Sequence, residues 1–288
     1  MAISLQDVRR LAGVALLLAC ALPGAGAAEA PLFDRLPVAV KGTKVLRMVG
    51  DSFAPYRIVA EDGKTVTGLE TDLVRALEPI LGVKIEQSIV SNLPAMLAGI
   101  DTGRYDLSSG PLLSTKAREE RYDIVTWLLS KPAWVLPASG RKTTRLEELC
   151  GLRISFAAGS TQEEYLRKVT ERCTAAGLPA TVPVALTDQN ATVLAVQSGR
   201  ADAASMQFAA ALHLLRQSPN KFHIQTDPTD ALGVLQLGFV TRKGSELTPV
   251  LHEALKRLWT SGDYAKILAK WGLSAAAAPE PRLNPSSR

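Results

Sequence analysis

One arginine stands where it could hold a negatively charged ligand. In Thr115-Lys116-Ala117-Arg118, Thr115 is a candidate N-cap, which places Arg118 in the first turn of a helix. A positive side chain is unusual there, because the helix dipole favours negative groups at that end. Two interpretations stay open on this spacing: a solvated surface arginine, or a guanidinium that points into a crevice and binds an anion through two hydrogen bonds.

A second candidate for anion binding follows the predicted strand 152–156. Gly159-Ser160-Thr161 comes between this strand and a helix that we expect from Gln162 to about Thr174. Backbone amides and hydroxyl groups at such a junction can bind an anion. The segment lacks the lysine and the glycine spacing of a P-loop, so it does not indicate a nucleotide site.

The N-terminal segment indicates the compartment. Arg9-Arg10 precedes an apolar run from Leu11 to Leu22, and Ala25 and Ala27 form an Ala-x-Ala site. This pattern is typical of a secretory signal peptide over residues 1–28, and the run is too short to span a membrane. We therefore expect a periplasmic protein. The segment Leu17-Leu18-Ala19-Cys20 leaves open a lipoprotein with Cys20 lipidated, although the apolar run continues past Cys20.

The cysteines and histidines favour a disulfide over a metal site. Cys150 and Cys173 remain once the signal peptide is removed, and an even pair in an exported chain favours a disulfide. Zinc would need more ligands at suitable spacing, and His213, His223 and His252 are scattered along the chain. We therefore expect no metal and no cofactor.

Two stretches of the chain repeat one pattern. An apolar, helix-like run ends in Gly103-Arg104-Tyr105-Asp106, and a second one ends in Gly199-Arg200-Ala201-Asp202. Glycine is typical of the left-handed residue that ends a helix, and each motif leads into a predicted strand. The repeat suggests two similar α/β lobes, and a crevice between lobes is a favoured place for a small ligand.

The order of the elements suggests how the lobes are divided. Strand, helix and strand alternate from Val45 to Val90, which predicts an α/β fold with largely parallel sheets. We expect residues 44–136 and 236–273 to form lobe 1, and residues 137–235 to form lobe 2. The tail 274–288 is rich in Ala, Pro and Ser without apolar periodicity, so we expect it to be disordered.

Composition argues against nucleic acid as a partner. The chain has 33 Lys and Arg against 28 Asp and Glu, a net charge of +5. The excess occurs in short clusters, such as Arg141-Lys142 and Arg242-Lys243, rather than in a basic stripe. This distribution is typical of solvated surface charge.

Seven short segments together identify a family. They are Phe53-Ala54-Pro55-Tyr56, Gly68-Leu69-Glu70-Thr71-Asp72-Leu73, Gly103-Arg104-Tyr105-Asp106, Thr115-Lys116-Ala117-Arg118, Gly159-Ser160-Thr161-Gln162, Gly199-Arg200-Ala201-Asp202-Ala203 and Tyr264-Ala265-Lys266-Ile267-Leu268-Ala269-Lys270-Trp271-Gly272. In this order, the run from Val45 to Leu273 resembles the family 3 extracellular solute-binding proteins, the polar amino-acid receptors of bacterial ABC importers. The resemblance implies a type II periplasmic-binding-protein fold, with two lobes joined by two crossing strands. It also supports a Cys150–Cys173 bridge.

The resemblance further implies which residues bind the ligand. The family's ring-stacking aromatic falls on Phe53, with Leu93 nearby on the same lobe, and the arginine that binds the ligand's carboxylate falls on Arg118. The other implied contacts are backbone donors of the loop from Gly110 to Leu113, and Ser160 and Thr161 from lobe 2.

Two positions depart from the family pattern. Leu113 replaces a Ser or Thr, so one hydrogen bond to the carboxylate is lost. Gln207 replaces the aspartate that pairs with the ligand's α-ammonium, and a neutral amide does not cancel that charge in a closed cleft. Either the ligand is not an α-ammonium compound, or another carboxylate, such as Glu70 or Asp51, compensates.

The sequence therefore favours a binding protein over an enzyme. The leading interpretation is a monomeric receptor that delivers a small carboxylate-bearing solute, a polar amino acid or related organic acid, to an inner-membrane ABC permease. A dehydratase acting on cyclohexadienyl acids would need an acid–base group in the crevice, for which Glu70 is the candidate. A third interpretation is a periplasmic partner of a redox enzyme or a sensor, which would bind no small molecule tightly.

Overall fold

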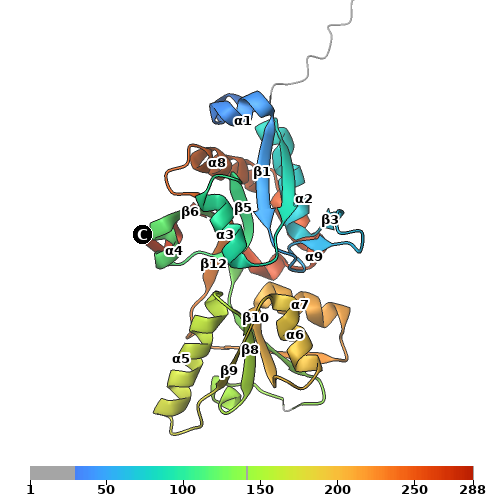
Figure 1. Ribbon diagram of the computed structural model, residues 1–288, viewed down its shortest axis with the longest axis vertical. Coiled ribbons are helices and arrows are strands. Elements are labelled where there is room, and N and C mark those ends of the chain that lie inside the picture. Colours follow the sequence, from blue (N-terminus) through green and yellow to red (C-terminus); the bar gives the residue numbers. More distant parts are fainter. Residues whose placement is uncertain (1–29, 141, 288) are drawn as a thin grey trace, which may run out of the picture.

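The structure, a computed structural model, describes residues 30–140 and 142–287 of the chain. Two lobes are each built around one sheet with helices packed against it (Figure 1). The α/β fold with two lobes is thus as the sequence predicts. The predicted signal peptide, including Cys20, lies outside the described residues.

The sheet of lobe 1 has the strand order β13-β6-β12-β5-β1-β4. Its strands are β1 (Val45–Gly50), β4 (Lys84–Ile89), β5 (Leu107–Leu113), β6 (Tyr122–Ser130), β12 (Leu235–Arg242) and β13 (Ala277–Leu283). β1 pairs in parallel with β4 and β5, as the alternation of strands and helices predicts. β12 pairs antiparallel with β5 and β6, because it returns from lobe 2, so the sheet is mixed rather than largely parallel.

Helices and a small hairpin complete lobe 1. They are α1 (Val38–Thr43), α2 (Leu69–Leu81), α3 (Leu93–Asp101), α4 (Lys116–Arg121), α8 (Leu247–Thr260), α9 (Asp263–Trp271), the 3-10 turns η1 (Phe33–Arg35), η3 (Ser274–Ala276) and η4 (Pro285–Ser287), and the hairpin strands β2 (Ile58–Val59) and β3 (Val66–Thr67). In α2, apolar residues four positions apart (Leu69, Leu73, Leu77) are buried against the sheet. Gly82 ends α2 with φ of 72°, and its N–H donates to Glu78.

The sheet of lobe 2 has the strand order β11-β7-β10-β8-β9. Its elements are β7 (Pro132–Pro137), η2 (Leu146–Leu149), β8 (Arg153–Ala157), α5 (Thr161–Ala175), β9 (Val182–Leu186), α6 (Gln189–Gln197), β10 (Ala203–Gln207), α7 (Phe208–Gln217) and β11 (Phe222–Thr226). β7 pairs with β10 and β11, so the chain enters lobe 2 at Lys131, one strand earlier than the expected boundary after residue 136. It returns between Thr226 and Leu235.

The repeated sequence motif corresponds to one repeated ion pair. Asp106 accepts from the backbone N–H of Arg47 at 2.8 Å and from its guanidinium at 2.7 Å, and Asp202 accepts from Arg153 at the same two distances. The aspartate therefore fixes the start of β5 against β1 in lobe 1 and the start of β10 against β8 in lobe 2. Gly103 and Gly199 adopt φ of 71° and 72°, as predicted for residues that end a helix.

The expected disulfide is present between Cys150 and Cys173. It joins the residue after η2 to the last turn of α5, whose first turn carries Thr161. The bridge therefore anchors the C-terminal end of α5, opposite the end that carries Thr161.

The prediction of a disordered C-terminal tail is wrong. Residues 277–283 form β13, an edge strand against β6, and Ala276 and Ala278 are buried. The register of β13 shifts between Ala277 and Arg282, where Pro279 and Pro281 lie. Proline lacks the N–H that a central strand would need, but it is tolerated at an edge. The same Ala- and Pro-rich composition that suggested disorder therefore fits an edge strand.

A buried arginine shapes the loop that follows β1. The Arg57 guanidinium donates to Asp51 at 2.6 Å, and it also contacts Glu70 and Ser109. It lies against Gly50, where a Cβ atom would collide with the guanidinium. Phe53 and Arg57 close the loop with two backbone hydrogen bonds of 3.0 Å. The loop is thus held from inside lobe 1.

Removal of the bridge should destabilise the protein without changing its ligand preference. The double substitution Cys150→Ala and Cys173→Ala should lower the free energy of unfolding by about 3 kcal/mol, because the unfolded chain regains the entropy of an open loop. Urea unfolding under oxidising conditions measures this difference. The reduced wild type is the control and should match the variant; equal stability of all three forms would contradict the prediction.

Glu70 should make stability depend on pH. Burial raises the pKa of Glu70 from its ordinary value of 4.5 to about 7, although Arg57 acts in the opposite direction. Between these two values the folded state holds the proton more tightly than the unfolded state, so the free energy of unfolding falls as pH rises. Glu70→Gln should flatten this slope. Urea titrations of both forms at several pH values test it, and parallel slopes would contradict it.

Candidate functional site

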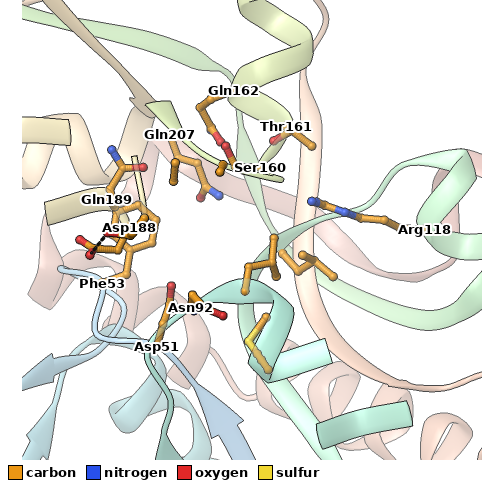
Figure 2. A pocket seen from close by; sticks show the side chains of 16 residues that line it. Asp51, Phe53, Asn92, Arg118, Ser160, Thr161, Gln162, Asp188, Gln189 and Gln207 are labelled. Atoms are coloured by element: carbon orange, nitrogen blue, oxygen red, sulfur yellow. Dashed lines mark hydrogen bonds between the residues drawn. The ribbon is translucent and has the colours of Figure 1, made fainter. Parts of the chain in front are cut away.

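A cavity lies between the two lobes. Residues of both lobes line it: Asp51, Phe53, Asn92, Leu93, Met96, Leu112, Arg118, Ala157, Ala158, Ser160, Thr161, Gln162, Thr187, Asp188, Gln189 and Gln207. Figure 2 shows Arg118 on one side of this cavity and Phe53 with Asp188 on the other. The site therefore offers a positive group at one end and negative groups at the opposite end.

Arg118 has the position that its sequence context predicts. Thr115 caps α4, and its hydroxyl accepts from the backbone N–H of Arg118 at 3.3 Å. The guanidinium donates to the backbone carbonyl of Leu113 at 3.0 Å. Among the described residues, no carboxylate pairs with it. Burial lowers the pKa of Arg118 to about 10, which reflects the cost of a cation that has left water without an anion.

Six of the eight residues assigned to the ligand line the cavity together. They are Phe53, Leu93, Arg118, Ser160, Thr161 and Gln207. The side chain of Leu113 is not part of the cavity lining. Leu112 lines the cavity instead, while the Leu113 side chain packs in the core of lobe 1, because successive residues of a strand face opposite sides. Leu113 still takes part through its carbonyl, which orients Arg118.

Gln207 connects the two lobes. It ends β10 in lobe 2, and its Oε1 accepts a hydrogen bond of 3.0 Å from the buried hydroxyl of Tyr56 in lobe 1. The ring of Tyr56 lies 5.4 Å from that of Phe53, measured between centroids. The carbonyl side of the Gln207 amide is thus turned to Tyr56. The residue that departs from the family pattern contributes a contact between lobes.

Of the two carboxylates expected to compensate for Gln207, only Asp51 reaches the cavity. Glu70 is fully buried in contact with Arg57 and does not line it. Asp51 lines the cavity and also pairs with Arg57 at 2.6 Å. Sequence reasoning missed a third carboxylate, Asp188 of lobe 2, which lines the cavity and pairs with no lysine or arginine of the described chain.

Asp188 is the N-cap of α6. Its carboxylate accepts from the N–H of Ala191 at 2.9 Å, and the Thr187 hydroxyl donates to it at 3.0 Å. In lobe 1, Asn92 caps α3 in the same way and also lines the cavity. Asn92 and Asp188 precede the two repeated glycine motifs at equal distances, so the repeat itself contained the signal for both residues.

Two polar groups at the start of α5, both in residues that line the cavity, have no hydrogen-bond partner in the described structure. They are the Oγ of Ser160 and the Nε2 of Gln162, both buried. A buried donor without a partner loses its hydration free energy, which a ligand acceptor would restore. Sequence reasoning assigned Ser160 but missed Gln162, although it occurs in one of the family segments. Both groups suit ligand oxygen atoms.

The described residues contain no group of His, Cys, Asp and Glu that could hold a metal ion. A helix long and apolar enough to cross a membrane is also absent from residues 30–140 and 142–287.

Several known proteins are similar to this chain in sequence and in structure. The arginine-binding protein ArgT of Corynebacterium glutamicum is 24% identical over 233 residues, which cover 81% of this chain and 75% of that protein. An ancestral arginine-binding protein solved with arginine is 26% identical, with a TM-score of 0.68 over 79% of this chain and 98% of the other.

A third relative extends the structural agreement. The amino acid ABC transporter substrate-binding protein AbpA of Streptococcus pneumoniae, solved with L-arginine, has a TM-score of 0.70 at 20% identity, over 83% of this chain and 99% of the other. This likeness supports the two-lobed fold. The sequence model of one protein family, the bacterial extracellular solute-binding proteins, family 3, matches residues 46–274. The chain therefore belongs to that family.

Proposed function

We propose that this protein is the periplasmic receptor of an ABC importer and that it closes on an amino acid with a cationic side chain. The observation that carries the proposal is Arg118, a partly buried cation without a carboxylate partner in the described chain, at one end of the cavity between lobes. A ligand carboxylate supplies the missing charge, and the planar guanidinium can bind both of its oxygens.

The other donors fit the same carboxylate end. Ser160 and Thr161 begin α5, and Gln162 follows them with its buried amide nitrogen unsatisfied. Closure of the lobes brings these donors of lobe 2 toward an anion bound by lobe 1. The ligand therefore connects the two lobes through one charged group.

The opposite end of the cavity supports a positive group on the ligand. Asp51 and Asp188 also line a second, outer cavity that does not include Arg118, so they lie away from the carboxylate end. An α-ammonium is separated from its carboxylate by one carbon, and a group at the far end must belong to the side chain. The names of the relatives, two of them arginine-binding proteins, agree with this assignment.

The family also supports the partner and the compartment. Its members are described as extracellular solute-binding proteins, and AbpA is described as part of an amino acid ABC transporter. We infer that the same kind of permease receives the ligand here. A dehydratase is less well supported, because Glu70, the acid expected for it, is buried against Arg57 and does not line the cavity.

Arg118→Ala should weaken binding of L-arginine about 100-fold. Loss of a desolvated charge pair costs about 3 kcal/mol, or about 100-fold in affinity. Arg118→Lys should restore little, because lysine cannot make the paired hydrogen bonds. Titration calorimetry measures both. The control is Arg121→Ala, on the same helix, whose exposed side chain pairs with Asp101 and should not affect binding. Affinity within about twofold of wild type for Arg118→Ala would overturn the assignment.

Asp188→Asn should remove the negative charge of Asp188 while keeping the N-cap of α6. Asparagine caps helices as well as aspartate does, so the fold should be retained while the negative charge is removed. We expect the affinity for L-arginine to fall about tenfold and that for L-glutamine to change by less than about twofold. Asn92→Ser, at the equivalent N-cap in lobe 1, is the comparison: Asn92 also lines the cavity, but its substitution changes no charge. Equal losses for both amino acids would instead assign Asp188 to the α-ammonium.

A further inference from the structure

The last residues of the described chain form a segment outside the family match. The match ends at residue 274, and β13 with η4 follows over residues 277–287. β13 extends the lobe 1 sheet at β6, and the C-terminus lies beside α4, the helix that carries Arg118 (Figure 1). We call residues 277–287 the C-terminal brace.

Ser286 of the brace contacts both sides of the turn that holds Arg118. Its backbone N–H donates to Glu119 Oε1 at 2.9 Å, and its hydroxyl donates to the carbonyl of Ser114 at 3.1 Å. The Ser114 hydroxyl in turn donates to the same Glu119 carboxylate. Glu119 is fully buried, so these hydrogen bonds form away from water and are correspondingly selective in geometry.

The residues that Ser286 holds are neighbours of those that orient the guanidinium. Ser114 lies between Leu113, whose carbonyl accepts from Arg118, and the N-cap Thr115. Glu119 directly follows Arg118. α4 has six residues, and a helix of this length depends on contacts outside itself.

The brace has its own attachment to the sheet. Asn284 accepts from the N–H of Ile124 at 2.8 Å and donates to Asp123 at 2.9 Å. His252 of α8 lies 3.0 Å from the carbonyl of Pro281. These contacts hold the brace in place independently of α4. Ser286 can therefore fix the position of the turn that precedes α4.

We propose that the C-terminal brace positions Arg118 for the ligand's carboxylate, with Ser286 as the positioning residue. The proposal rests on the proposed function only for the identity of the group that Arg118 binds. In the described part of the chain, the hydrogen bonds of the brace reach no residue that lines the cavity, so the brace acts on Arg118 through α4 and the turn before it.

Two truncations test the proposal. A chain that ends at Asn284 loses both contacts of Ser286 but keeps β13 and the Asn284 anchor. A chain that ends at Ser286 keeps them all and is the matched control. A single substitution, Ser286→Ala, removes the hydroxyl contact alone, with Ser287→Ala as its control, because Ser287 is exposed.

Binding of L-arginine is compared with that of L-argininamide, which lacks the carboxylate. The shorter chain should lose about tenfold in affinity for L-arginine and little for L-argininamide. In an Arg118→Lys background the truncation should have no further effect. Equal losses for both compounds would indicate general loosening of lobe 1 and overturn the proposal, as would unchanged affinity for both.

Hydrogen exchange of the α4 amides provides a readout that needs no ligand. Exchange at Arg118 and Glu119 should accelerate in the chain that ends at Asn284 and remain unchanged in the chain that ends at Ser286. If the wild type binds no amino acid, the proposed function fails, and this measurement still decides whether the brace holds α4. Unchanged exchange in both chains would overturn the proposal that the brace holds α4 in place.

Discussion

The candidate site is organised around a cation, Arg118, that the described chain leaves without an anion. Arg118 is partly buried, and the described chain gives it one carbonyl, that of Leu113, but no carboxylate. An uncompensated charge in a poorly hydrated cleft is tolerated only where the surroundings fix it in place. Three features hold Arg118 in place: the N-cap Thr115, the buried Glu119, and β13 at the edge of the lobe 1 sheet. An anion bound there, as we propose, would relieve a cost that folding has already incurred.

Arg57, the other buried arginine of lobe 1, differs from Arg118 because it has carboxylate partners. Arg57 contacts Asp51, Glu70 and Ser109, so its charge is matched inside the protein and it contributes rigidity rather than affinity. One consequence is that Asp51 faces the cavity with part of its charge already shared. Asp188, which lacks such a partner in the described chain, is the stronger determinant of the potential at that end.

Sequence patterns predicted the parts of the site that depend on local geometry. The Thr115 cap and the position of Arg118 in its first turn follow from short-range rules. The Cys150–Cys173 bridge was predicted instead from an even pair of cysteines in an exported chain. Strand facing was not predictable in this way: Leu112 rather than Leu113 faces the cavity, and a shift of one residue reverses the face. Gln162 was missed because its role depends on burial, which only the packed lobes reveal.

The hydrogen bond between Tyr56 and Gln207 bears on how the two lobes move relative to each other. It joins the lobes through protein groups alone, and a buried hydrogen bond of this kind contributes about 1 kcal/mol net, or about a fivefold change in population. The arrangement of the lobes seen here is therefore favoured to that extent over one in which Tyr56 and Gln207 are separated, and any process that parts the lobes must offset this contact.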